Sequence, residues 1–218
     1  MPDMSADLHH DSSSVDEQVK ATPEENTHTK PLSSTRSLIF FALIVLIIVL
    51  PIRLYVAKPF IVSGTSMFPT FNTWHYLIID QLTYKFKEPT RGDVVVFRFP
   101  QNPSRFFIKR IVGLPLETVE LNGNTVTIRN TEFPEGFTLD EPYVDDAYTK
   151  ESQLVMELGD NEYFVLGDNR KASADSRYWG PLEFERIVGR AYLRLFPFNL
   201  VEVLPGETAY TITSNNEK

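Results

Sequence analysis

Ser66 stands where a chain can present a nucleophile. In residues 60–71 a short apolar run stops at Gly64, Ser66 follows two residues later, and Pro69 comes three residues after that. Glycine leaves the backbone free to turn before the hydroxyl, and proline restrains it afterwards. We therefore interpret Ser66 as a candidate nucleophile. The alternative is that it is an ordinary serine in a Gly/Pro loop.

A nucleophilic serine needs a base, and the composition leaves few groups for that role. The chain contains no cysteine, which excludes thiol catalysis, disulfides and thiolate metal sites. Of its four histidines, three (His9, His10 and His28) precede a long hydrophobic run, and only His75 follows it. If that run crosses a bilayer, a histidine-dependent hydrolase or a multi-histidine metal site beyond it would depend on His75 alone. We therefore expect no metal and no other cofactor.

Lys109 is the candidate base. A lysine can accept a proton when burial lowers its pKa, because a buried site disfavours the ammonium form. Lys109 follows an apolar run, with Phe107 and Ile111 at alternate positions and therefore on the same face of a strand. A lysine that shares a face with bulky apolar groups is costly unless it is exposed, paired or functional. The alternative is that Lys109 and Arg110 end an edge strand in water.

A third stretch, residues 167–180, gathers small hydroxyls, carboxylates and arginines around a turn. Its Ser173 is placed to orient a neutral lysine through a hydrogen bond. Asp175 and Arg177 are close enough in sequence to form a buried ion pair that holds the loop. The alternative is a polar loop built on Asx-type turns, with no part in chemistry.

Short strands are the elements that must position these groups. The β-rich runs, separated by turn signals, are residues 94–99, 106–108, 118–121, 125–129, 163–166 and 191–195. Asn122-Gly123 between alternating residues predicts a hairpin. No long amphipathic helix competes, so we expect a mainly β, antiparallel domain over residues 58–205. Its least patterned part, about 116–160, is a possible small insertion subdomain.

The length, the net charge and the composition limit the number of domains, the kind of partner and the parts of the chain that can fold. The 218 residues leave room for one substantial domain with additional segments. A formal net charge of −8, with no long basic run, argues against a nucleic-acid partner. Residues 1–36 carry almost no large apolar side chains, which predicts a disordered acidic tail. Residues 206–218 are expected to fray.

The hydrophobic run predicts a membrane anchor. Residues 37–52 carry no charge, and sixteen helical residues span about 24 Å, slightly less than the roughly 30 Å hydrocarbon core. Extension past Arg53, whose long side chain can reach the interface, closes the gap and places a single transmembrane helix at 37–57. A cleaved secretory signal fits less well, because no small-x-small site follows. A slight excess of Lys and Arg before the run favours a cytoplasmic N-terminus.

Together these stretches resemble the type I signal peptidases (leader peptidases), which are membrane-anchored serine endopeptidases that remove signal peptides from exported proteins. The blocks that carry the resemblance follow the family's order behind the expected anchor and are residues 63–70, 91–97, 107–115 and 167–177. The resemblance covers roughly residues 60–195. It implies an antiparallel, barrel-like β catalytic domain behind one N-terminal transmembrane helix in the plasma membrane, with the catalytic domain on the extracytoplasmic side.

The resemblance also implies roles for individual residues. Ser66 would be the nucleophile that forms an acyl-enzyme, its backbone N–H would bind the oxyanion, and Lys109 would be the general base. The support residues would be Arg110, Ser173, Asp175 and Arg177. The chain departs from some members at Gly64, where they carry a second oxyanion hydroxyl, and at Leu116-Glu117, where the family has Gly-Asp.

The resemblance further implies that the substrate is the signal peptide of a preprotein. An extended peptide would add to the strand that contains residues 60–63 by β-augmentation. The residues expected to line shallow pockets for small side chains, as in an Ala-x-Ala site, are Phe60, Val62, Met67, Phe107 and Ile108. Apolar residues near the anchor either rest on the lipid bilayer or belong to the core; they are Phe60, Phe68, Trp74, Phe99 and Phe106.

Two rival interpretations remain. Self-cleaving SOS-response repressors share this type of Ser/Lys catalytic domain, but they carry a DNA-binding region where this chain has a tail and a hydrophobic run. The other rival is an anchored β-module that has kept the fold and lost activity. The presence of both Ser66 and Lys109 argues against it.

Overall fold

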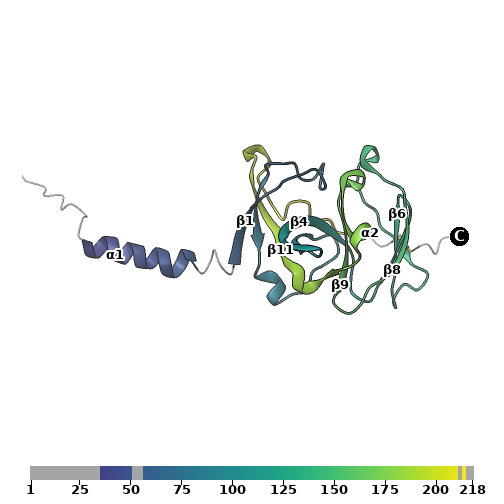
Figure 1. Cartoon of the computed structure of the whole chain (residues 1–218), viewed down its shortest axis with the longest axis horizontal. Coiled ribbons are helices and arrows are strands. Elements are labelled where there is room, and N and C mark those ends of the chain that lie inside the picture. Colours follow the sequence, from purple (N-terminus) through teal and green to yellow (C-terminus); the bar gives the residue numbers. More distant parts are fainter. Residues whose placement is uncertain (1–34, 51–55, 211–212, 215–218) are drawn as a thin grey trace, which may run out of the picture. The chain divides into compact units, whose positions relative to one another are not determined.

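The computed structural model describes residues 35–50, 56–210 and 213–214. The chain divides into two units, residues 1–41 and 42–218. Helix α1 (Thr35–Ile44) continues as a π-helical segment, Val45–Val49, and its side chains are all exposed (Figure 1). None of the helices in the described ranges is long and apolar enough to cross a membrane. The predicted tail, apart from its last two residues, and residues 51–55 of the predicted anchor lie outside these ranges.

Residues 56–210 form a mainly β structure in which every strand pairing is antiparallel, as predicted. The first sheet has the order β1-β2-β11-β3-β4-β9-β10, with β12 pairing to β11. Its strands are β1 (Ala57–Ile61), β2 (Tyr76–Asp80), β3 (Val94–Phe99), β4 (Asn102–Gly113), β9 (Glu162–Leu166), β10 (Leu182–Glu183), β11 (Ile187–Phe196) and β12 (Glu202–Val203).

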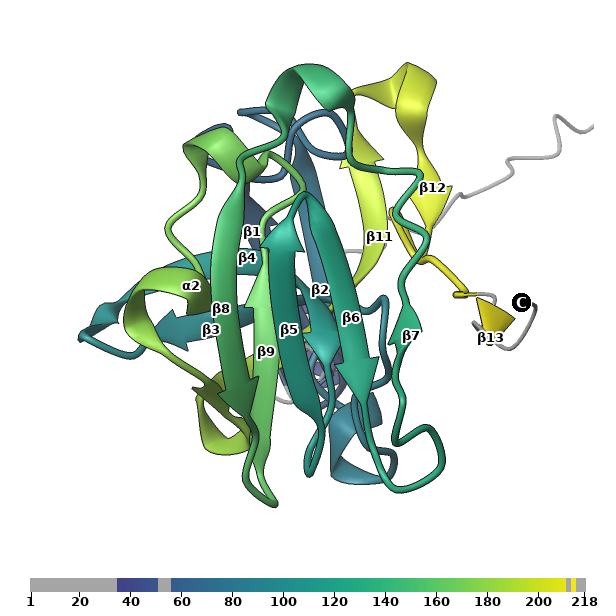
Figure 2. The ribbon, with the colours of Figure 1, turned by 90° about the vertical axis from the view of Figure 1, so that its right-hand side faces the viewer.

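A second sheet has the order β13-β7-β6-β5-β8 and lies in front of the first in Figure 2. Its strands are β5 (Thr118–Gly123), β6 (Thr125–Arg129), β7 (Phe137–Thr138), β8 (Ser152–Glu157) and β13 (Thr213–Ser214). The predicted hairpin is present: Asn122 pairs with Thr125, and Gly123 takes a φ of +63° that suits glycine.

Short helical segments connect these strands. They are helix α2 (Ser176–Trp179) and the 3₁₀ turns Thr83–Lys85, Asp146–Tyr148, Arg170–Ala172, Phe184–Arg186 and Phe198–Leu200. Strands β2 and β8, which the sequence analysis did not predict, are held by long-range pairing: β2 to β1 and β11, and β8 to β5.

The core explains why the strands form where they do. The run Val94, Val95, Val96 and Phe97 is buried on both faces, as expected for a central strand. The second sheet, which lies within the stretch interpreted as a possible insertion subdomain apart from its last strand, shares one apolar cluster with β4 and β9. That cluster joins residues of both sheets, among them Val112, Val119, Ile128, Phe137, Phe164 and Leu166.

Residues 206–210 do not fray, contrary to our expectation for this end of the chain. Tyr210 packs against the core of the second sheet, and its hydroxyl lies 2.5 Å from that of Tyr143. The carbonyl of Gly206 accepts a hydrogen bond from Arg110. At Gly92, which has a φ of +96°, an added Cβ would lie 2.1 Å from the Thr208 carbonyl oxygen, so glycine is required where this segment crosses.

Candidate active site

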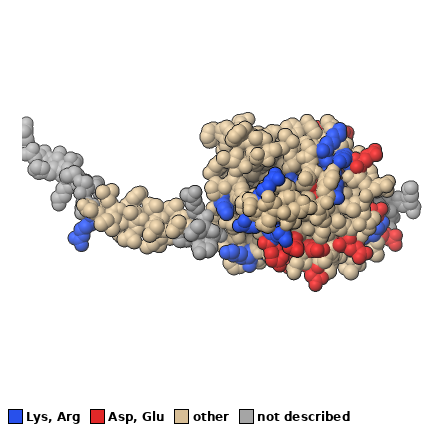
Figure 3. Space-filling view, in the orientation of Figure 1, with Lys and Arg blue, Asp and Glu red and all other residues tan. Residues whose placement is uncertain are grey.

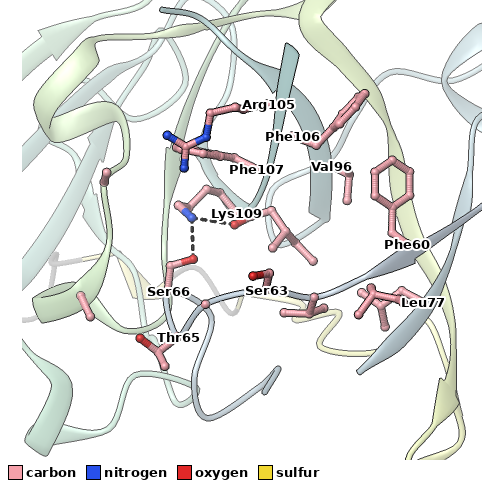
Figure 4. Close-up of a pocket in the computed structure, with 16 residues that line it drawn as sticks. Phe60, Ser63, Thr65, Ser66, Leu77, Val96, Arg105, Phe106, Phe107 and Lys109 are labelled. Carbon is pink, nitrogen blue, oxygen red and sulfur yellow. Dashed lines mark hydrogen bonds between the residues drawn. The ribbon is translucent and has the colours of Figure 1, made fainter. Parts of the chain in front are cut away.

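A groove of about 700 Å³ runs between the end of β1 with the loop that follows it and the middle of β4 (Figure 4). One wall consists of residues 60–66, and the other consists of residues 105–109 of β4. Leu77 and Val96 lie at its base, and Ala172 and Ala174 of the 167–180 stretch also line it. All three stretches singled out in the sequence therefore meet at one groove.

Ser66 and Lys109 contact each other in this groove. The Nζ of Lys109 donates to the Oγ of Ser66 over 2.7 Å and to the carbonyl of Ile108 over 2.8 Å (Figure 4). The Lys109 side chain is almost fully buried, with 3 % of its surface exposed. The edge-strand alternative for Lys109 is wrong, because β4 lies between β3 and β9.

Burial sets the protonation of Lys109. It lowers the pKa of Lys109 from its ordinary 10.5 to about 8, because desolvation disfavours the ammonium form. The carboxylates of Asp175 and Asp168 oppose this shift, and the charge of Arg177 adds to it. A lysine with a pKa near 8 is neutral in about a tenth of the molecules at pH 7, compared with far fewer at its ordinary pKa, so it can act as a proton acceptor.

The loop that presents Ser66 is fixed at both ends. Gly64 has a φ of +102°, and the Thr73 hydroxyl bonds both its main-chain atoms: Oγ1 accepts from the Gly64 N–H over 3.2 Å and donates to the Gly64 carbonyl over 3.1 Å. On the other side, the carbonyl of Ser66 accepts from the Asn169 N–H over 3.1 Å. Thr73 was not predicted, and nothing in its local sequence indicates this role.

The main-chain N–H of Ser66, which the sequence analysis expects to bind the oxyanion, is free: within the described chain it has no hydrogen-bond acceptor. The N–H of Gly64 is taken by Thr73, so Gly64 supports the loop and does not supply a second donor. Ser63 and Thr65 both line the groove.

The 167–180 stretch is anchored by the ion pair that its sequence predicted. Arg177 donates from Nε and Nη2 to the two carboxylate oxygens of Asp175, over 2.8 and 2.9 Å, and Asp175 is fully buried. Asp175 also accepts from the Gly167 N–H over 3.1 Å. At Gly167 an added Cβ would lie 2.4 Å from the carbonyl oxygen of Ser66, so only glycine lets this loop approach Ser66 so closely.

Ser173 is placed differently from our expectation. It is buried beside Gly167, but its Oγ has no hydrogen-bond partner in the part of the chain that the structure describes. The predicted hydrogen bond from Ser173 to Lys109 is therefore not formed. The nearest polar contact of the Lys109 amine remains Ser66.

Arg110 lies beside Lys109 in sequence but has different contacts. Its Nε and Nη2 donate to both carboxylate oxygens of Asp168, over 2.9 and 2.8 Å. The guanidinium also donates to the carbonyl of Gly92 and stacks on the Tyr143 ring at 3.7 Å. Asp168 in turn accepts from the Thr70 hydroxyl over 2.5 Å. Arg110 thus supports the loop after Ser66 through Asp168.

Four of the five predicted substrate-binding residues line the groove: Phe60, Val62, Phe107 and Ile108. Met67 is the exception. It is 1 % exposed and packs in the core with Phe71 and Leu77, because the chain turns inward directly after Ser66.

The apolar residues near the predicted anchor differ in exposure. Trp74 is 71 % exposed, and Phe106 is exposed while its ring packs edge-on against Phe60 at 5.3 Å. Phe68 and Phe99 are half-buried, against Tyr148 and Phe107.

His75 and the acidic residues do not form a competing site. His75 is buried outside the groove lining, and its Nδ1 accepts from the Asn72 N–H over 3.4 Å. Burial, with the nearby charge of Arg194, lowers its pKa. Among the described residues there is no group of three or more His, Asp or Glu side chains that could hold a metal ion.

Comparison with known proteins identifies the family. Residues 35–196 match the signal peptidase family, peptidase S26. The signal peptidase I of Leptolyngbya laminosa is 35 % identical over 171 residues, which cover 75 % of this chain and 81 % of that protein. Signal peptidase I T of Bacillus subtilis (strain 168) is 31 % identical over 193 residues, which cover 82 % and 96 %.

One solved structure is also similar, a signal peptidase I from Enterococcus faecalis V583. It is 33 % identical and covers 48 % of this chain and 97 % of that chain, with a TM-score of 0.41. The family assignment rests on the match over residues 35–196 and on the identities over most of both chains, and does not use this structure. The chain therefore belongs to the signal peptidase family, peptidase S26, and is a serine peptidase of the signal peptidase I type.

Proposed function

We propose that this protein is a membrane-bound serine endopeptidase that removes N-terminal signal peptides from exported preproteins after a small-x-small site. In this proposal Ser66 and Lys109 form the catalytic dyad. The observation that carries it is the 2.7 Å contact between the Ser66 hydroxyl and a buried lysine whose pKa is lowered to about 8.

Acylation begins with the neutral amine of Lys109. It takes the proton of Ser66 as Oγ attacks the scissile carbonyl, and the free N–H of Ser66 stabilises the oxyanion that forms. When the intermediate collapses, the C–N bond breaks and Lys109 returns the proton to the leaving amine. The signal peptide is then held as an ester on Ser66.

Deacylation uses the same two residues. Lys109 takes a proton from a water molecule that attacks the ester carbonyl, the C–O bond to Ser66 breaks, and the proton returns to the serine oxygen. The free carboxylate of the signal peptide leaves. The support residues keep this geometry: Asp175 and Arg177 hold the 167–180 stretch, and Thr73 and Asn169 hold the loop that carries Ser66.

The groove favours an extended peptide with small side chains at two alternate positions. A substrate strand between residues 60–63 and β4 would pair with main-chain groups and point alternate side chains at Val62 and Ile108. Residues 37–57 serve in this proposal as a single anchor in the plasma membrane, with a cytoplasmic N-terminus and the catalytic domain outside.

The test is cleavage of a peptide with an Ala-x-Ala site, in detergent, by the wild-type protein and by Ser66→Ala. We expect cleavage after the second alanine by the wild type and none by the variant. Mass spectrometry of the products locates the cut. If both proteins are folded and inert, the chain is an inactive anchored module, and if both cleave, Ser66 is not the nucleophile.

A further inference from the structure

The groove carries only positive charge. Of its lining residues, Arg105 and Lys109 are the charged ones, and the lining contains no Asp or Glu. In Figure 3 one group of Lys and Arg lies over the part where β1 and β4 lie, a second group lies at the upper right beside acidic residues, and most Asp and Glu lie along the lower part towards β8 and β9. Lys109 is occupied by Ser66, which leaves Arg105 as the charge available to a substrate.

Arg105 is held in place without a carboxylate partner. Its guanidinium lies over the Phe107 ring, 5.3 Å from the centroid, and Phe107 is itself stacked on Phe99 at 4.4 Å. The Arg105 side chain is exposed, and no Asp or Glu in the described ranges forms an ion pair with it. In Figure 4 the Arg105 and Lys109 side chains extend from β4 towards the same side. The aromatic platform thus presents a fixed, unneutralised cation to the groove.

The position of Arg105 defines which part of a substrate it meets. Residues 105 and 109 are four strand positions apart, about 13 Å at 3.3 Å per residue. The guanidinium lies over Phe107, which is two positions from Lys109. A peptide lying along β4 therefore brings side chains two to four residues from the scissile bond within reach of Arg105.

We propose that Arg105 is a specificity-determining residue that favours substrates with an Asp or Glu two to four residues from the scissile bond, outside the two small-residue positions of the site, and disfavours Lys or Arg there. This inference rests on the proposed function of the groove. An acidic side chain would gain an ion pair with a preorganised guanidinium, whereas a basic one would be repelled, because no carboxylate of the groove offsets the charge.

Arg98 provides a matched control. It is also an exposed arginine, and its guanidinium also lies over a phenylalanine, Phe106, at 5.0 Å. It stands on the adjacent strand β3 and does not line the groove. A charge reversal at Arg98 therefore changes the net charge of the domain as much as one at Arg105 does, without changing a charged residue of the groove lining.

The experiment uses Ala-x-Ala peptides that carry Glu, Lys or Gln at one position, two or four residues before the scissile bond or two to four residues after it, so that both alanines of the site are kept. The full-length wild type, Arg105→Glu and Arg98→Glu are compared in detergent by kcat/KM. Within each variant the Glu/Lys ratio is taken, so that any change in the Lys109 base cancels. At one position or at neighbouring positions we expect the wild type to prefer Glu about threefold to fivefold. Arg105→Glu should invert this ratio, and Arg98→Glu should keep it.

Three results would overturn the inference. If the Glu/Lys ratio of kcat/KM is the same in the wild type and in Arg105→Glu at every position, Arg105 does not contribute to substrate specificity. If Arg98→Glu changes the ratio as much as Arg105→Glu, the effect belongs to the net charge of the domain. If the wild type does not cleave even the Gln peptides, the proposed function is wrong, and the inference, which rests on it, is wrong as well. The absence of any cleavage distinguishes this result from the other two.

Discussion

Lys109 and Arg110 are neighbours on β4, both are buried, and their surroundings differ in one decisive respect. The Lys109 amine meets a hydroxyl and a carbonyl, and burial lowers its pKa to about 8. Burial would also lower the pKa of Arg110, but the two hydrogen bonds and the charge of Asp168 outweigh it and raise the pKa. The same desolvation thus yields a proton acceptor on one side and a permanent cation on the other.

The difference shows that adjacent residues of one strand can differ in role: Arg110 connects structural elements, and Lys109 can exchange a proton. A buried cation with a carboxylate partner is locked in its charged form and ties together the elements that supply its contacts. A buried cation without a close carboxylate carries an electrostatic cost, which is relieved when it loses its proton. Methionine, which has a similar length and no charge, is therefore an informative replacement at both positions.

Lys109→Met should produce the largest effect, on catalysis. Loss of the general base is expected to lower kcat/KM on an Ala-x-Ala peptide by about 10²–10⁴-fold. The melting temperature at pH 7 should not fall, because the variant removes a buried ammonium group. Near-normal turnover would remove lysine from the mechanism, and a large loss of stability would assign Lys109 a structural role.

Arg110→Met should produce the next largest effect, on stability. Removing one member of a buried ion pair leaves Asp168 uncompensated and costs about 3–5 kcal/mol in free energy of unfolding, or roughly 10 °C in melting temperature. Urea unfolding measures it. Arg190→Met is the control, since the Arg190–Asp80 pair is partly exposed and separated by 3.5 Å, so its loss should cost about 1 kcal/mol or less. Equal losses in the two variants would contradict the comparison.

The pH dependence of kcat/KM should be the smallest of these effects, and it is the one most specific for the protonation of Lys109. If Lys109 must be neutral, kcat/KM should fall about tenfold per pH unit below its pKa of about 8 and level off above it. A rate that is flat between pH 6 and pH 9 would contradict the assignment of the base.

Stability should depend on pH with a definite sign. The folded-state pKa of Lys109, about 8, lies below its ordinary 10.5, so the unfolded chain binds more protons between these values. The free energy of unfolding should therefore rise with pH across that window, relative to Lys109→Met. A difference between the two proteins that does not change with pH would show that Lys109 is not the titrating group.

Much of the site could be predicted because its signals are local. The glycine and proline around Ser66, the alternation around Lys109 and the short spacing of Asp175 and Arg177 are all visible within a few residues. The predicted strands at 94–99, 125–129 and 163–166 carry their own β propensity, and each is present. These patterns could be recognised because β propensity, alternation and the presence of Gly or Pro depend only on the residues within each segment.

The misplaced and missed residues are those whose contacts depend on how the chain turns and packs in three dimensions. Met67 was assigned to the groove because it adjoins Ser66, but the turn after Ser66 directs it into the core. Ser173 was assigned a bond to Lys109, yet its Oγ has no partner within the described residues. Thr73 and Asp168, which hold the two sides of the Ser66 loop, had no local signal.

By itself, the sequence determined the chemical inventory: one serine in a turn, one lysine on an apolar strand, and neither thiols nor a set of histidines to compete with them. Tertiary structure decided which of the two neighbours could accept a proton. Asp168 lies 58 residues from Arg110, and the hydroxyl of Ser66 lies 43 residues from Lys109. Since a pKa depends on burial and on the nearest charges, only the packing of β4 between β3 and β9 could make Lys109 a proton acceptor and Arg110 a fixed cation.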